Sequence, residues 1–506
     1  MGIITDIARR HFAQRVRHLQ SIAGSLEAVQ RRQLARLLSA ARSTEYVKAH
    51  GGADSYEQWA ERFPTATYEE MRPYVERMVR GERDVLWRGR CRRFAQSSGT
   101  SDGRSKFVPV TDDSLRWCHY RGASDAVAHY LAVRRHSRMF EGKGFILGGS
   151  FSSTITPPPG VKIGDLSANL IEAINPVVNL FRVPSKRVAL MEKWEEKLPA
   201  LVEASLRADV TNISGVPSWF LTVLKRVLEA AGASEIHQVW PHLEVFLHGG
   251  ISFKPYRDQY DAIIDPSRMT YVETYNASEG FFAVQSDLAD PAMLLLPDVG
   301  VFYELLPFDA LGTPEERKAI IPCWKARAGV AYELIITACN GLWRYRIGDT
   351  VTVASLNPLK ILIAGRTKHY INAFGEELMV HNAEAAIAAA QRATGLRVLN
   401  YTAAPVYTTS QSHGRHQWLI EWDSQPTTEQ IERFARALDD ALRSVNSDYD
   451  AKRSGDIFLD RLSITTAVPG LFDRWLASTG KLGGQRKVPR LSNSRDIIDR
   501  MLTLNS

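Results

Sequence analysis

The sequence predicts an α/β protein with two domains, a large N-terminal domain of mixed sheets and helices and a smaller α+β domain after it. With 506 residues the chain is longer than one hydrophobic core usually supports, so at least two domains are expected. Its 44% hydrophobic and 24% charged residues are typical of a globular protein. Strand-like and helical segments alternate up to about residue 366, which favours parallel strand pairing.

Periodicity places the elements of the large domain. Residues 1–90 are expected to be helical, with apolar residues at helical spacing in 26–41 and 56–79. Helices are expected at 192–207 and 219–231. The predicted strands are 145–148, 210–213, 244–247, 270–273 and 301–305. Asn340-Gly341 lies between alternating segments and predicts a hairpin with a type I′ turn.

The pattern after residue 366 is that of a smaller α+β unit. Helices are expected at 381–392 and 427–445, where Thr427 and Gln430 have the spacing of a capping box. Strands are expected at 397–405, 417–422 and 457–466. A basic, glycine-rich loop runs from 480 to 490.

The charge and the apolar pattern of the sequence argue against two classes of protein. The net charge is +7, and the first 50 residues hold nine Lys/Arg against three Asp/Glu, so the rest of the chain is nearly balanced. This argues against a nucleic-acid groove spread over the fold. No apolar run approaches the roughly 20 residues that span a bilayer, so no integral membrane segment is expected.

The basic start of the chain has three interpretations. A transit peptide or a membrane-surface helix would be rich in arginine and amphipathic. We favour a solvated helical face that caps the large domain. Charges interrupt the first thirty residues, which excludes a secretory signal and predicts a cytoplasmic protein.

The stretch from Gln96 to Lys106 concentrates serine, threonine and glycine in a short turn that ends in a lysine. Glycine permits close backbone approach, and amide and hydroxyl groups together form a nest for anionic oxygens. A nucleoside triphosphate is the expected ligand, although the spacing is not that of a Walker A motif. The flanks predict a hairpin tip followed by a helix near 111–113, and the alternative is a plain Ser/Gly surface loop. The candidate phosphate-binding residues are Ser97, Ser98, Gly99, Thr100, Ser101 and Lys106.

Three further motifs follow the hydroxyl-rich loop along the chain. The segments Y-x-x-S-E-G at 275–280, Y-R-x-G-D at 345–349 and G-R-x-K at 365–368, after the hydroxyl-rich loop, resemble the adenylate-forming superfamily of acyl-CoA synthetases and luciferases. The segments TNISGVPSW at 211–219, GLWRYRIGD at 341–349 and GQRKVPR at 484–490 are similar to the acyl-acid amido synthetases. These form the auxin-responsive-promoter family of plants, with bacterial relatives. The resemblance runs from about residue 30 to 496.

This resemblance implies an ATP and Mg²⁺ site. Glu279 would be the Mg²⁺ ligand, since magnesium is commonly held by one or two carboxylates together with phosphate oxygens. Ser278 would contact the α-phosphate or the acyl group. The alternative for Glu279 is a helix N-terminal carboxylate in contact with the helix dipole.

The nucleoside would be held by residues of three segments. Asp349 would accept hydrogen bonds from both ribose hydroxyls, because its two oxygens match a vicinal diol. Arg366 would support the ribose or the α-phosphate. Tyr275 would stack on adenine, and Gly249 and Gly250 would pass close to the ring.

The small domain would supply the catalytic cation. By resemblance, the domains are 1–366 and 367–506 with a hinge near 367–368, and Lys487 stabilises charge on the α-phosphate during carboxylate attack. Lys481 and Arg486 are rivals for that role, and a basic surface loop is the alternative.

The candidates for the acyl pocket lie at helical spacing after the phosphate loop and are Trp117, Tyr120 and Arg121. Such a stripe is more often core packing.

The resemblance implies an ATP-dependent ligase acting in two steps. A small-molecule carboxylic acid is adenylated to acyl-AMP, and the acyl group then passes to an amine, expected to be that of an amino acid. The nearest rival is an acyl-CoA ligase with the same first step and a thiol acceptor. A non-catalytic nucleotide-binding or nucleic-acid-binding module is the second alternative. The sequence names neither the acid, nor the amine, nor an oligomeric state.

Overall fold

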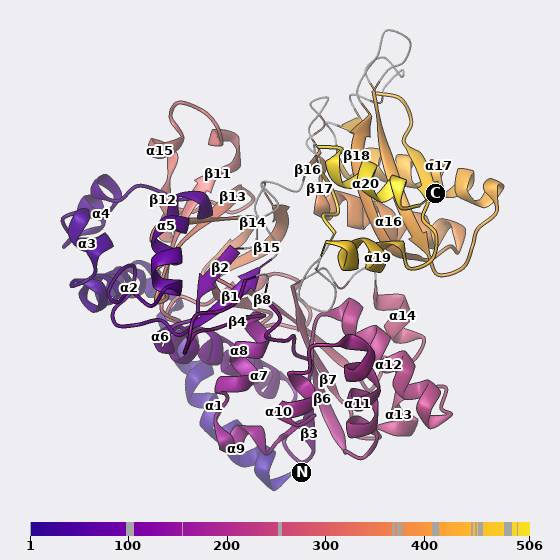
Figure 1. Ribbon diagram of the computed structural model, residues 1–506, viewed down its shortest axis with the longest axis horizontal. Coiled ribbons are helices and arrows are strands. Elements are labelled where there is room, and N and C mark those ends of the chain that lie inside the picture. The colour runs from indigo at the N-terminus through magenta and orange to yellow at the C-terminus, as the bar shows by residue number, and fades with distance from the viewer. Residues whose placement is uncertain are drawn as a thin grey trace. The chain divides into compact units, whose positions relative to one another are not determined.

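The computed structural model shows an α/β chain that divides into two compact units (Figure 1). The larger unit comprises mainly Met1–Ile347 and Thr352–Leu362, and the smaller mainly Ile363–Leu482 and Arg486–Ser506 with Gly348–Val351. The structure describes residues 2–97, 106–153, 155–250, 253, 256–366, 370–371, 376, 378–406, 414–446, 449–450, 453, 459–479, 488–492 and 494–505. Among these residues, no helix has both the length and the apolar character to cross a bilayer.

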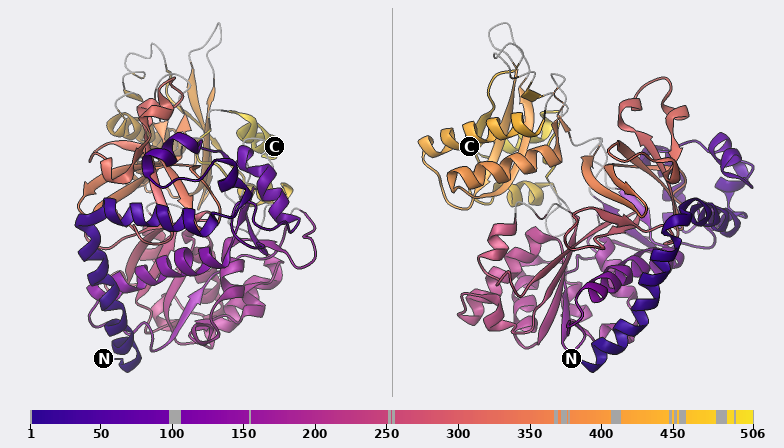
Figure 2. Two further views of the ribbon diagram at one scale, coloured as in Figure 1. Left: turned by 90° about the vertical axis from the view of Figure 1, so that its left-hand side faces the viewer. Right: turned by 180° about the vertical axis from the view of Figure 1, so that it is seen from behind.

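The prediction of a helical start is confirmed as far as Val79, whereas residues 80–90 form turns and bends. The helices are α1 Ile3–Ile22, α2 Leu26–Ala41, α3 Glu45–Ala49, α4 Tyr56–Arg62 and α5 Tyr68–Val79. Helix α2 coincides with the predicted segment, whereas 56–79 forms two helices instead of one. The break has a local cause: Phe63 is extended before Pro64, and Thr67 with Glu70 forms a capping box that starts α5. Figure 2 shows α1 as a long helix along the outside of this unit.

A 12-stranded sheet is the framework of the larger unit, in the order β12-β11-β13-β14-β15-β10-β9-β8-β7-β6-β3-β5. Its parallel part consists of β5 Arg182–Val183, β3 Lys143–Ile146, β6 Val210–Gly215, β7 Val245–Gly249 and β8 Thr270–Ala277. The other strands are β9 Gly280–Val284, β10 Met293–Leu295, β11 Val301–Pro307, β12 Ile321–Pro322, β13 Ala331–Ala338, β14 Tyr345–Leu356 and β15 Leu359–Arg366. All five predicted strands are therefore confirmed, with parallel pairing along four of them.

Helices cover the parallel strands and bury an aromatic-rich core. α11 Trp194–Leu206 and α12 Pro217–Ala231 match the two predicted helices (Figure 1). Phe220 of α12 packs edge to face with Phe145 of β3 at 5.2 Å between ring centroids. The shorter helices are α8 Leu166–Ala173, α9 Pro176–Asn179, α10 Lys186–Ala189, α13 Ile236–Val239, α14 Arg257–Asp261 and α15 Glu316–Ala319.

A separate three-stranded sheet carries the hydroxyl-rich loop. β1 Arg93–Ser97 pairs antiparallel with β2 Lys106–Pro109 and parallel with β4 Lys162–Gly164. Thr111 caps α6 Asp112–Ser114, which continues through a π-helical turn, Leu115–His119, into α7 Tyr120–Val133. The predicted hairpin, and the helix start near 111–113, are confirmed.

The Asn340-Gly341 turn differs from the prediction. It joins β13 and β14, but the prediction of a type I′ turn is wrong. That turn type requires a positive φ at both central residues, and here Gly341 has a φ of 91° whereas the φ of Asn340 is not positive. The turn closes with a hydrogen bond from Gly341 N to Ala338 O at 3.1 Å. The Asn340 side chain is engaged in a contact described below.

The smaller unit is α+β, as predicted. Its elements are β16 Tyr370–Ile371, β17 Leu378–Met379, α16 Val380–Thr394, β18 Val398–Val406, β19 Arg415–Trp422, α17 Thr428–Val445, β20 Ser463–Thr466, α19 Leu471–Ser478 and α20 Asp496–Thr503. The capping box of Thr427 and Gln430 is confirmed. Strand β20 is shorter than the predicted 457–466. The predicted domain boundary at 366/367 and the hinge stay predictions, since 367–369 lie outside the described residues.

Candidate active site

The hairpin β1–β2 positions the ends of the hydroxyl-rich loop. Ser97 and Lys106 face each other in the register, so the loop begins and ends at one point. Ser98, Gly99, Thr100 and Ser101 lie outside the described residues, as does the Ser97 side chain. Their phosphate-binding role stays a prediction.

Two tyrosines anchor the base of this hairpin. The Phe107 amide donates to the Tyr68 hydroxyl at 2.7 Å, and Lys106 Nζ lies 3.5 Å from the Tyr345 hydroxyl and 5.6 Å from the Tyr68 ring centroid. Burial raises the pKa of Tyr68 to about 12, so its hydroxyl remains protonated at neutral pH. Lys106 is thus held between α5 and β14 at the loop's end, where a cation can meet phosphate.

The Y-x-x-S-E-G segment is a tight turn between β8 and β9. Ser278 and Glu279 form it, and each is only 7% exposed. The fully buried Asn340 donates from Nδ2 to the main-chain oxygen of Glu279 at 3.0 Å. Glu279 therefore belongs to a strand–turn–strand unit, and the alternative of a helix N-terminal carboxylate is wrong.

A second bond ties the same region to the helix after the phosphate loop. Thr111 Oγ1 donates to the main-chain oxygen of Cys339 at 2.7 Å. The 339–341 turn thus contacts both α6 and the Glu279 turn. Sequence reasoning treated Asn340 only as a turn former and missed its side chain, because the N-G signal concerns backbone geometry alone.

The Y-R-x-G-D segment lies on β14. Tyr345 and Asp349 are buried, and Gly348 between them has a positive φ of 81°. Arg346 forms ion pairs with Glu333 at 2.5 Å and Glu316 at 2.6 Å. The arginine of this motif therefore has a structural role. Asp349 stays the candidate of this motif for binding the ribose hydroxyls.

Arg344, just before this motif, is also structural. It lies at φ 42° and makes a buried bidentate pair with Glu304, both bonds at 2.9 Å. Its other bonds go to the main-chain oxygens of Ala60 and Phe63. This network joins β14 to α4 and β11, and fixes the strand on which Asp349 lies.

Gly249, the last residue of β7, packs closely against β8, and Gly250 follows it. A Cβ on Gly249 would collide with the main-chain oxygen of Thr274, and Gly250 has a positive φ of 81°. Tyr275 is buried and packs edge to face with Phe282 at 5.0 Å. Their contacts with adenine stay predictions.

His248, beside these glycines, is a residue that sequence reasoning missed. It is 4% exposed, its ring lies 4.6 Å from that of Phe253, and its Nδ1 has no partner within the described part of the chain. Burial lowers its pKa to about 3, so the imidazole is neutral at physiological pH. No pattern in the sequence distinguishes it from the other histidines.

The candidate acyl-pocket residues have different surroundings. The Tyr120 hydroxyl donates to the Leu170 main-chain oxygen at 2.8 Å, and Arg121 lies 3.6 Å from Asp298. Trp117, in the π-helical turn, remains 45% exposed. The Arg116 guanidinium lies 4.7 Å from the centroid of the Trp117 ring, so all three residues have protein partners, and Trp117 is the one whose ring remains partly accessible. Their substrate roles stay predictions.

The remaining candidates cannot be placed. The Arg366 main chain ends β15, but its side chain lies outside the described residues, and so do Lys487 and its rivals Lys481 and Arg486. Over the described residues, no group of three or more His, Cys, Asp or Glu side chains is arranged to hold a metal. A buried single carboxylate, Glu279, still fits Mg²⁺ that takes its other ligands from phosphate and water.

Comparison with known proteins identifies the family. Three family models match in order: the GH3 family N-terminal domain at 15–269, the central domain at 293–366 and the C-terminal domain at 381–496. This chain belongs to the GH3 family. The resemblance to acyl-acid amido synthetases is thereby confirmed.

Curated GH3 relatives match along nearly their whole length. A probable indole-3-acetic acid-amido synthetase GH3.2 of Oryza sativa subsp. japonica is 24% identical, over 96% of this chain and 92% of the relative. The indole-3-acetic acid-amido synthetase GH3.8 of Oryza sativa subsp. indica is 23% identical, over 96% and 91%.

Solved structures share the fold. The AtGH3.15 acyl acid amido synthetase in complex with 2,4-DB has a TM-score of 0.78 at 20% identity, covering 97% of this chain and 95% of that one. A 2-hydroxyisobutyryl-CoA ligase in the postadenylation state, in complex with 2-HIB-AMP, has a TM-score of 0.60 at 12% identity, covering 94% and 91%. The adenylate-forming fold class is therefore confirmed.

Proposed function

We propose that this GH3 protein is an ATP-dependent acyl-acid amido synthetase. A carboxylate oxygen of a small acid attacks the α-phosphorus of ATP, which forms acyl-AMP and releases pyrophosphate. The amine of an amino acid then attacks the acyl carbonyl, which forms the amide, releases AMP and loses one proton. The observation that carries the proposal is the match of all three GH3 domains, in order, to a chain that aligns with amido synthetases over 96% of its length.

Within this proposal the protein positions the reactants and neutralises charge. The loop 97–106 binds the β- and γ-phosphates, with Lys106 at its end. Asp349 accepts hydrogen bonds from the ribose hydroxyls. Glu279, its main chain fixed by Asn340, is the protein ligand for Mg²⁺, and bound Mg²⁺ would neutralise charge on the phosphates.

The smaller domain, 367–506 in the proposal, turns about a hinge near 367–368 between the two half-reactions. Lys487 then enters the site for adenylation and leaves for acyl transfer. A cytoplasmic location is part of the same proposal.

The relatives indicate a chemical class for the carboxylic acid substrate. The relatives' names give indole-3-acetic acid, an acid that bears an aromatic ring, and a similar structure contains 2,4-DB. The accessible ring of Trp117 suits such a substrate. We therefore propose that an aromatic or alicyclic acid is the substrate.

A specific observation keeps the acyl-CoA ligase as a second candidate, because the fold is also shared with a CoA ligase. The test incubates the protein with ATP, Mg²⁺, an acid panel and either amino acids or coenzyme A. We expect acid-dependent AMP release that amino acids stimulate, together with an acyl–amino acid detected by mass spectrometry. Stimulation by coenzyme A alone, with a thioester product, would replace the proposal by the second candidate. No AMP or pyrophosphate with any acid would refute both.

A further inference from the structure

A hollow of about 710 Å³ on the larger unit is lined by arginine and small residues. Its lining contains no carboxylate. The arginines come from α2, from the turn that follows it and from the segment before β1. The lining residues are Arg32, Ala35, Arg36, Ser39, Ala40, Arg42, Ser43 and Arg88.

Three of these arginines have no ion pair. Among the ion pairs of the described residues, none includes Arg32, Arg36 or Arg42, whose side chains are exposed. Neighbouring arginines behave differently: Arg31 pairs with Glu27 at 2.9 Å, and Arg77 pairs with Glu45 at 2.6 Å. The hollow therefore concentrates positive charge from three unpaired arginines, with Arg88 beside them.

Helix stability does not account for this arrangement. Arg32 and Arg36 are at i and i+4 of α2, where two like charges repel and an acidic partner would stabilise. Arg42 caps the C-terminus of α2, where a cation is favourable, so helix electrostatics explain only that one. The opposite face of α2 is buried, with Leu34 and Leu37 in the core.

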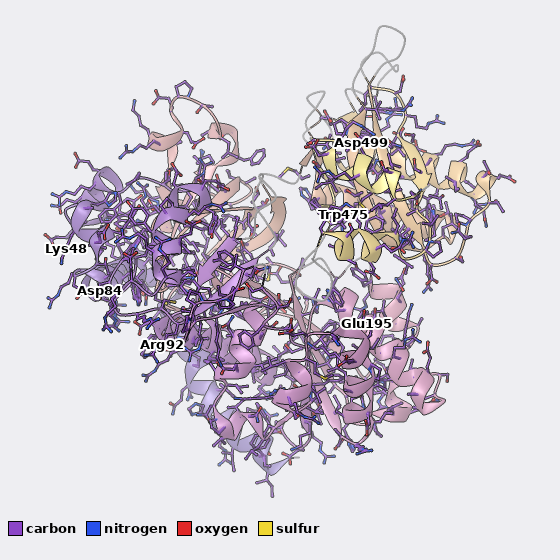
Figure 3. All side chains as sticks on the ribbon, in the orientation of Figure 1. Lys48, Asp84, Arg92, Glu195, Trp475 and Asp499 are labelled. Atoms are coloured by element: carbon purple, nitrogen blue, oxygen red, sulfur yellow. The ribbon has the colours of Figure 1, made fainter. Side chains whose placement is uncertain are left out.

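Arg88 is held in place from outside the hollow. Its guanidinium pairs with Asp113 through Nη2 at 2.8 Å and Nε at 3.1 Å, and the Trp87 indole donates to the same oxygen at 3.0 Å. The backbone before it is fixed by the bond from Glu45 N to Asp84 O at 2.8 Å. Figure 3 labels Asp84 on this segment and Lys48 on the adjoining α3.

We propose that this hollow is a second anion site, separate from the ATP site, that binds a small molecule bearing several phosphate groups. Arginine guanidinium groups bind phosphate oxygens in bidentate fashion. Ala35, Ser39, Ala40 and Ser43 leave room for the anion to approach, and the two serine hydroxyls can donate to its oxygens.

Direct binding tests the proposal, so the result stands whether or not the protein is a ligase. Tripolyphosphate and inositol hexakisphosphate are titrated calorimetrically into the protein without ATP, because the triphosphate of ATP would itself compete for the hollow. The first probe represents a free inorganic polyanion and the second a phosphoester. We expect at least one to bind with a stoichiometry of one.

Two double variants distinguish a site from a general field effect. Arg32→Gln with Arg36→Gln removes two charges from the hollow, and Arg10→Gln with Arg17→Gln removes two exposed charges from α1. We expect the first pair to weaken binding roughly tenfold or more and the second pair to change it little. Equal loss in both variants, no loss in the first, or equally tight binding of citrate would overturn the proposal.

Discussion

At the scale of single residues, the contact of Asn340 with Glu279 is the least expected feature of the site. A buried amide holds the main chain of the proposed Mg²⁺ ligand, although it has no role in the chemistry itself. Asn340 is thus a positioning residue. Its effect should appear in the metal dependence of the reaction, not only in stability.

We predict that Asn340→Ala raises the Mg²⁺ concentration required for pyrophosphate release. The variant should also lose about 1–3 kcal/mol of stability, because the Glu279 carbonyl is left buried without its donor. Asn340→Asp is the matched variant, since it keeps the size but removes the donor, and it should behave at least as badly. A normal Mg²⁺ requirement in a folded Asp variant would show that the bond does not position Glu279.

We predict that replacement of Asp349 weakens ATP binding and leaves the stability of the fold nearly unchanged. Asp349→Asn keeps the shape of the side chain but loses the charge that strengthens hydrogen bonds from the ribose hydroxyls. We expect the KM for ATP to rise roughly tenfold or more, which is the size of a charged hydrogen bond, with little change in Tm. Asp287→Asn, at an exposed position, is the control. An unchanged KM for ATP would remove Asp349 from the nucleotide site.

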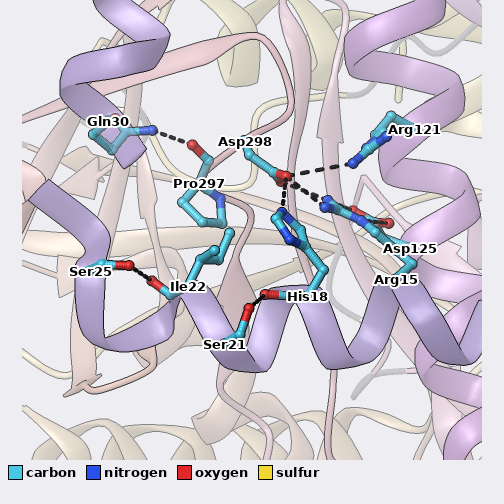
Figure 4. A network of polar contacts seen from close by, with 10 residues as sticks. All are labelled: Arg15, His18, Ser21, Ile22, Ser25, Gln30, Arg121, Asp125, Pro297 and Asp298. Atoms are coloured by element: carbon cyan, nitrogen blue, oxygen red, sulfur yellow. Dashed lines mark hydrogen bonds and ion pairs between the residues drawn. The ribbon is translucent and has the colours of Figure 1, made fainter. Parts of the chain in front are cut away.

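At the scale of elements, an ionic network attaches the basic helix α1 to the fold. Arg15 bonds both oxygens of Asp125 on α7 at 2.7 Å and both oxygens of Asp298 at 2.6 Å (Figure 4). Arg121 and His18 also face Asp298. The arginine-rich start of the chain therefore includes a partly buried ion-pair network with a structural role, which explains part of the positive charge that the sequence shows there.

Replacement of Arg15 should destabilise the protein in a pH-dependent way. Burial alone would raise the pKa of Asp298, but hydrogen bonds and charge from Arg15, with Arg121 and His18, outweigh it and lower the pKa. A carboxylate with a lowered pKa contributes stability above its ordinary pKa, and this contribution is lost as the pH falls through the lowered value.

We therefore expect Arg15→Met to lose about 3–5 kcal/mol of unfolding free energy at neutral pH, because the buried Asp125 loses its ion-pair partner and the partly buried Asp298 keeps only Arg121 and His18. The difference from the unmodified protein should shrink in acid, where the carboxylates are protonated. Urea denaturation at several pH values measures it, with the exposed Arg10→Met as control. A loss of the same size at every pH would show that packing, and not charge, is what Arg15 contributes.

Sequence patterns predicted the helices and strands more accurately than they predicted contacts between side chains. The strand at 270–273, the hairpin around the hydroxyl-rich loop and helix 26–41 follow from local periodicity, and the structure has them at those places. The pairing of Arg346 with Glu333 joins residues of different strands, and no local signal announces it. The role of Asn340 was missed for the same reason, because its partner is 61 positions away.

At the scale of the whole molecule, the account depends on a cation supplied by the smaller domain. We predict that Lys487→Ala cuts adenylation steeply while ATP binding stays nearly intact, since the charge is needed on the α-phosphate during attack. Lys481→Ala is the matched control on the same loop. Acid-dependent pyrophosphate release and equilibrium ATP binding measure the two effects, and the reverse ranking of the two variants would transfer the role to Lys481.

In the proposed reaction, a carboxylate oxygen attacks the α-phosphorus of ATP before the amide forms. An acid labelled with ¹⁸O in its carboxylate tests this directly, with the products analysed by mass spectrometry. The account predicts one ¹⁸O atom in AMP, none in pyrophosphate, and the remaining label in the amide. Label in orthophosphate, or AMP that forms without label, would contradict it.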